Sequence, residues 1–160
     1  MELKERYGLR GEVEHKVWDK FGNLKIHRPF SPNQVQDAGL AVMADRILKD
    51  APGSEDGVDY IATGTGTGQA VTDTTLATEV TDSGLERTAG TGTRVTTTTS
   101  NDTAQLVVSF SVTGTVSVTE VGMFNASSAG DMVAYQTQTA LPLVSGDTYQ
   151  ITWKLVFDQA

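Results

Sequence analysis

Apolar and polar residues alternate along several short segments of this 160-residue chain, which is the pattern of half-buried β-strands. The clearest segment lies near the C-terminus. There, apolar side chains take every second position: Tyr149, Ile151, Trp153, Leu155 and Phe157. Side chains two residues apart in a strand share a face, so we expect these five to point into the main core.

Further strands are predicted from the same alternation or from threonine-rich runs, because β-branched side chains pack well on a pleated sheet. They cover residues 60–62, 91–99, 106–112, 116–124 and 132–139, with a loop at Asn125–Asp131. Short strands separated by turn residues are typical of a β-sandwich. We therefore expect a mainly β protein with a β-sandwich or jelly-roll-like body.

Helical spacing of apolar residues occurs in one convincing segment. Its apolar positions are Val35, Leu40, Met43, Ile47 and Leu48. Asn33 is the expected N-cap, and Ala51-Pro52-Gly53 is expected to end the helix. A single helical turn is also predicted within Asp73–Val80, with Leu76 and Val80 facing inward.

The N-terminal part predicts a β-hairpin over residues 11–28, with a turn at 19–23. The stretch from Arg28 to Pro32 contains two prolines, which favour a stiff, extended linker. We therefore divide the chain into an N-terminal arm, residues 1–33, and a helix plus β-sandwich body, residues 34–160. Because a lone hairpin is marginal in water, the arm is expected to pack on another polypeptide.

Charge is unevenly distributed between these two parts. The formal net charge is −8, but residues 1–33 hold seven basic and five acidic side chains, leaving 5 basic and 15 acidic for the rest. An acidic body repels phosphate backbones, so no nucleic-acid partner is expected. The N-terminus lacks the apolar region of a signal peptide, and no segment reaches the roughly 18 apolar residues of a membrane span. The absence of cysteine excludes disulfides and thiolate chemistry.

Motifs that would indicate catalysis or a cofactor are incomplete. Gly64–Gly68 is glycine-rich but matches neither a dinucleotide-binding nor a P-loop pattern, which favours a flexible loop. His15 and His27 lack companion ligands for zinc and are expected to be polar surface residues. The acidic stretch Ser54–Asp59 could bind calcium, although a solvated loop fits better. No nucleophile elbow is present. We predict no enzyme, no cofactor and no catalytic or metal-ligating residue.

Candidate contact residues lie mainly in the predicted arm, where apolar and basic side chains need a surface to cover. They are Arg6, Arg10, Val13, Val17, Trp18, Leu24, Ile26, Arg28 and Phe30. In the body, Glu120 interrupts an apolar face. Its carboxylate is therefore expected to be hydrogen-bonded near a Gly122 turn or at a subunit contact, with Asn125 close by.

Four segments, taken in order, resemble a family of small structural virion proteins of tailed bacteriophages, whose members are described as head-decoration or tail-fibre-like. The segments are Tyr60–Thr67, Asp73–Val80, Val118–Ala126, and Val144–Asp147 followed by Ile151–Trp153. The chain departs from the family where Met123 replaces a frequent leucine. Arg87 stands in for a frequent arginine after the second segment, and a second frequent arginine, near Tyr135, is absent.

The resemblance implies a capsid decoration, or cement, protein that binds the outer surface of the assembled head. A protein that binds the lattice but not its separate subunits stabilises the lattice by mass action. The expected partners are the major capsid protein or other virion subunits, and the expected oligomer is a homotrimer assembled in the host cytoplasm. A tail, collar or fibre adaptor is the alternative, and an envelope-binding or hydrolytic β-domain is a distant third.

Overall fold

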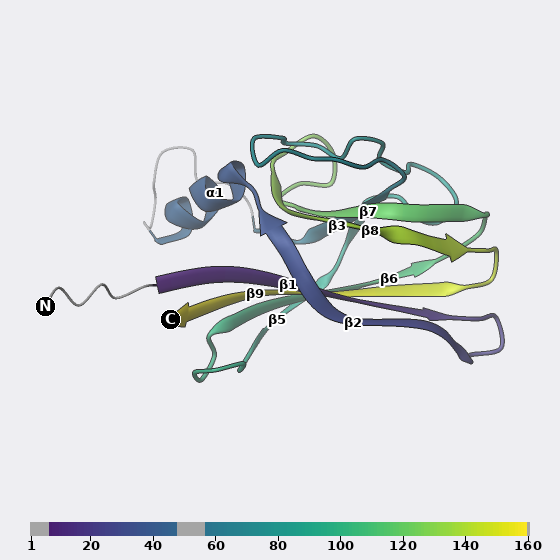
Figure 1. Cartoon of the computed structure of the whole chain (residues 1–160), viewed down its shortest axis with the longest axis horizontal. Helices are drawn as coiled ribbons and strands as arrows, with labels where there is room; N and C mark the ends of the chain where they lie inside the picture. The colour runs from purple at the N-terminus through teal and green to yellow at the C-terminus, as the bar shows by residue number, and fades with distance from the viewer. Residues whose placement is uncertain (1–6, 48–56, 160) are drawn as a thin grey trace, which may run out of the picture.

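Strands dominate the structure, a computed structural model that describes residues 7–47 and 57–159 (Figure 1). They are β1 (Tyr7–Trp18), β2 (Leu24–Val35), β3 (Tyr60–Gly64), β4 (Thr88–Ala89), β5 (Thr91–Val95), β6 (Thr103–Ser111), β7 (Val116–Phe124), β8 (Met132–Leu143) and β9 (Thr148–Gln159). One helix, α1 (Asp37–Ile47), follows β2. The expectation of a mainly β, sandwich-like fold with one short helix is confirmed.

The strands form two layers that are joined at both sides. The strand order is β4-β3-β7-β8-β2-β1-β9-β6-β5, and every pairing is antiparallel. β2 pairs with β1 in one layer and then, through Gln34 and Val35, with β8 in the other. On the opposite side Gly90 forms the corner between β4 and β5. A Cβ on Gly90 would lie 2.7 Å from the backbone carbonyl oxygen of Val107, which favours glycine at this corner.

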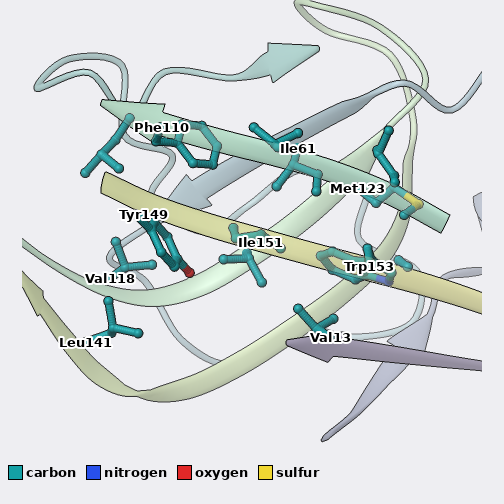
Figure 2. Packing of buried hydrophobic residues seen from close by; sticks show 14 of the residues in the cluster. Val13, Ile61, Phe110, Val118, Met123, Leu141, Tyr149, Ile151 and Trp153 are labelled. Atoms are coloured by element: carbon teal, nitrogen blue, oxygen red, sulfur yellow. The ribbon is translucent and has the colours of Figure 1, made fainter. Parts of the chain in front are cut away.

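The main core lies between the layers (Figure 2). β6 and β9 supply alternating apolar side chains from one layer, and β3, β7 and β8 supply them from the other. Residues at the centre include Ile61, Phe110, Val118, Met123, Leu141, Tyr149, Ile151 and Trp153. The predicted inward faces of β6 and of β9 as far as Leu155 are confirmed, because these side chains are at most 5% exposed.

The N-terminal hairpin exists but is not a separate arm. β1 lies between β2 and β9, pairing with β9 along its whole length, and Val13 and Val17 are fully buried in the core. The hairpin therefore buries its apolar face within its own sandwich. The predicted boundary at residue 33 lies inside β2.

The predicted linker is part of β2. The register between β1 and β2 shifts between Val13↔Ser31 and His15↔Arg28, so Pro29 lies in a bulge. A bulge tolerates proline because the ladder hydrogen bond is already interrupted there.

Two helical predictions need correction. α1 begins at Asp37, because Asn33 and Val35 belong to β2, and the predicted helix end at residues 51–53 lies outside the described residues. Asp73–Val80 has no helical turn, although Leu76 and Val80 do face inward. This segment belongs to a covering loop, residues 65–82, that packs on the outer face of the β3–β7–β8 layer.

Candidate functional site: an apolar groove and two polar clusters

An apolar groove of about 690 Å³ opens at one end of the sandwich. Its lining comes from α1, β5, β6, β7, β9 and the segment before β3. The lining residues are Met43, Val58, Gly92, Thr93, Arg94, Ala104, Gln105, Leu106, Met123, Leu155 and Phe157. An apolar surface that stays open to solvent is characteristic of a binding site for another molecule.

Among the described residues, the apolar core does not fully cover the inner face of the sheet at this end. Phe157 continues the inward-facing series of β9, yet its side chain is 51% exposed, which corrects the prediction that all five alternating residues are buried. Leu155, two residues earlier, is only 5% exposed. The inner face of β9 therefore extends beyond the part of the opposite layer that would cover it.

A second apolar surface lies around the tip of the β1–β2 hairpin and the neighbouring β8–β9 turn. Phe21 is 77% exposed, and Leu24 and Val144 are about half exposed. These residues border a second hollow together with Lys25, which is ion-paired with Asp147 at 2.7 Å. We call Phe21, Leu24 and Val144 the tip cluster.

His15, expected at the surface, is buried at the centre of a polar network. Its Nδ1 is 2.7 Å from the Tyr149 hydroxyl, and its Nε2 is 2.7 Å from Gln136 Oε1. The Gln136 amide nitrogen donates to the carbonyls of Ser31 and Pro32, so Oε1 is the acceptor and His15 Nε2 carries the proton. Tyr149 then donates to His15 Nδ1.

Burial strongly favours the neutral form of His15. Removal from water, with the positive charge of Arg28 adding to the effect, lowers the pKa of His15 from 6.5 to about 4. The hydrogen bond to Gln136 opposes this shift only in part. Burial likewise raises the pKa of Tyr149 well above its ordinary value. Both groups therefore remain uncharged at neutral pH.

Gln136 of this network and the neighbouring Arg28 connect β2 to β8 where the backbones of the two strands do not pair. β2 meets β8 only through Gln34 and Val35. Beyond that point the Arg28 guanidinium donates to Thr139 O at 2.6 Å and Ala140 O at 3.1 Å, and Gln136 spans the gap as described. These side chains replace the missing backbone ladder, which gives the buried network a structural role.

Glu120 anchors the covering loop. Its carboxylate is fully buried and accepts hydrogen bonds from the backbone N–H groups of Gly66, Thr78 and Ala77 at 2.9, 2.8 and 3.2 Å. Gly122, where a turn was expected, is a strand residue of β7. Three N–H donors stabilise a buried carboxylate that would otherwise be too costly to bury.

Arg87 anchors the neighbouring loop at residues 125–131. Its guanidinium pairs with Glu79 through two hydrogen bonds, donates to the carbonyls of Ala126 and Ala129, and lies over the Phe124 ring at 3.6 Å. Asn125 helps to close the loop, since its Oδ1 accepts from the Asp131 N–H at 2.8 Å. Glu120 therefore bonds to the covering loop, residues 65–82, whereas Asn125 bonds within the loop at residues 125–131.

The predicted contact residues are divided between core and surface. Val13 and Val17 are fully buried and Arg28 bonds to β8, so these three do not form a free contact surface. Trp18 and Ile26 are half-buried, whereas Arg10, Leu24 and Phe30 are exposed. Arg6 lies outside the described residues. Sequence reasoning missed Phe21, although an aromatic residue at the apex of a predicted turn was the available signal.

Metal-binding and membrane-spanning features can be assessed in the described part of the chain. No group of three or more histidine, aspartate and glutamate side chains there could hold a metal ion. Within residues 7–47 and 57–159, no helix combines the length and apolarity needed to cross a membrane. His27, unlike His15, is exposed and bonds to Glu14 at 2.9 Å.

Comparison with known proteins does not assign the chain to a family. No family model, no curated protein and no solved structure matches it.

Proposed function

We propose that this protein is a structural virion protein of a tailed bacteriophage, a capsid decoration protein that binds the assembled head and stabilises it through contacts between subunits. The observation that carries the proposal is the open apolar groove of about 690 Å³ at one end of the sandwich. When another protein covers an apolar surface of this kind, the free energy of the complex falls relative to that of the separate proteins.

The arrangement of the resembling segments also supports the proposal. Tyr60–Thr67 includes β3, which pairs with β7 in Val118–Ala126, and Asp73–Val80 lies against both through Glu120. Three of the four segments therefore form one hydrogen-bonded unit. Proteins that share a fold need the same residues at the positions where such a unit is held together, so this placement is consistent with a shared fold.

The tip cluster is the second surface available for subunit contacts. It lies at the end of the hairpin, away from the end where β9 finishes and the groove opens (Figure 1). Two apolar surfaces on opposite ends allow one molecule to touch two neighbours. We propose a homotrimer as the oligomer, and light scattering after size-exclusion chromatography measures it directly.

The decisive experiment combines the purified protein with heads of the phage that encodes it, assembled without the protein. We expect cryo-electron microscopy to show added density on the outer face of the head, and the decorated heads to withstand a higher temperature than undecorated ones. Density confined to the tail, collar or fibres would favour the adaptor alternative. Absence of binding to every virion component would refute the proposal.

A further inference from the structure

The free edge of β5 borders the apolar groove. β5 pairs with β6 through five residue pairs, from Thr91↔Val107 to Val95↔Thr103. Its other edge has no strand partner in the part of the chain that the structure describes. Gly92, Thr93 and Arg94 of this strand also line the groove. Backbone donors and acceptors on a free edge can pair with an incoming strand.

The inner face of the sheet is hollow next to that edge. Gly92 pairs with Leu106, and Arg94 pairs with Ala104. Directly opposed residues share a face, so Gly92 and Arg94 point to the same side as the buried Leu106. A Cβ on Gly92 would meet nothing within 4 Å, and Ala104 is exposed. Two small residues thus leave room for a side chain from outside.

Arg94 indicates the charge of the occupant. It is exposed, lines the groove and has no ion-pair partner among the described residues. A carboxylate from a bound molecule would complement it. A second copy paired symmetrically through the same edge would instead bring a second Arg94 to the same face, and like charges across paired strands destabilise.

We propose that β5 accepts an extended segment of another virion polypeptide as an added strand. The segment places an apolar side chain over Gly92 and Ala104 and a carboxylate beside Arg94. This inference rests on the proposed function and names how the partner is held. Main-chain hydrogen bonds to β5 provide affinity, and the groove and Arg94 provide specificity.

Three variants test the inference by co-sedimentation with heads assembled without the protein. Ala104→Phe fills the hollow, and Arg94→Glu reverses the charge at its rim. Ser109→Phe is the matched control, because Ser109 is an exposed residue of the same strand on the opposite face. We expect the first two to weaken head binding at least about tenfold, a loss of roughly 1.4 kcal/mol, and the control to bind like wild type.

Hydrogen exchange of the β5 amides gives a second readout. On wild-type protein bound to heads, the outward-facing amides of residues 91–95 should exchange more slowly than in the free protein. If wild type binds heads while Ala104→Phe binds equally and β5 exchange is unchanged, the inference is wrong and the proposed function stands. If wild type binds no virion component, the proposed function itself fails.

Two other occupants are distinguishable in the isolated protein. A change in oligomer mass for Ala104→Phe, measured by light scattering, would mean that a second copy fills the groove. A large loss of unfolding free energy in this variant, without heads, would mean that a segment of the same chain fills it. Either result would overturn the inference.

Discussion

Acid sensitivity is expected to arise in large part from His15. Its pKa is lowered by burial from 6.5 to about 4 in the folded protein, whereas the unfolded chain restores the ordinary value. The unfolded state therefore binds more protons between pH 6.5 and 4. The contribution of His15 to the free energy of unfolding is fully present above pH 6.5 and decreases as the pH falls towards 4. Below pH 4 this residue causes no further loss.

The size of the effect follows from the shift. A difference of about 2.5 pKa units corresponds to about 3 kcal/mol of unfolding free energy. This is a large part of the total stability of a small domain. His15→Gln removes the titration while keeping a donor for Gln136 and an acceptor for Tyr149. The variant should therefore show a much flatter dependence of stability on pH, whatever its stability at pH 7.5.

The assay is denaturant unfolding followed by tryptophan fluorescence, at several pH values between 7.5 and 4 and at constant ionic strength. His27→Gln is the matched control, since His27 is exposed and glutamine can still donate to Glu14. All three proteins keep the same aspartate and glutamate side chains. If wild type and His15→Gln lost stability in parallel as the pH decreased, the inference that His15 is buried in its neutral form would be refuted.

Three other predictions concern the core, the covering loop and the hairpin. Trp153→Ala should lower the free energy of unfolding by about 3–5 kcal/mol, and Phe157→Ala by much less, because the first is fully buried and the second half exposed; chemical denaturation compares them. Glu120→Gln should cost about 1–3 kcal/mol and speed hydrogen exchange in residues 65–78, and unchanged exchange would contradict the anchoring role. Deleting residues 1–30 removes β1 and should abolish cooperative unfolding in calorimetry. If the truncated protein still folded, residues 1–33 would be a separate arm after all.

Local alternation predicted which faces of the strands are buried, because the two-residue period is a property of each segment alone. It could not predict where the opposite layer ends, which is why Phe157 was expected in the core. It also could not predict that β1 pairs with β9, since Val13 and Trp153 are 140 positions apart. No pattern within residues 1–33 reveals that partner.

The sequence carried a signal for both buried polar side chains, His15 and Glu120, but for His15 the usual surface position of histidine outweighed it. His15 lies between Val13 and Val17 at two-residue spacing, so it shares their buried face. Glu120 interrupts an apolar run, and the sequence did predict that its carboxylate would need hydrogen-bond donors. The identity of those donors depends on how the 65–82 loop folds back over β7, and such long-range placement of an irregular loop has no periodic signature.

The pairing of β1 with β9 has a consequence for the order of events during synthesis. β1 leaves the ribosome early, but the strand that flanks it in the finished sheet is β9, which is made more than a hundred residues later. Until then the core-facing side chains of β1 have only β2 beside them. Contacts of such large sequence separation fold slowly. The nascent chain therefore carries an unmatched strand edge for most of its translation, and is exposed to aggregation or chaperone capture during that interval.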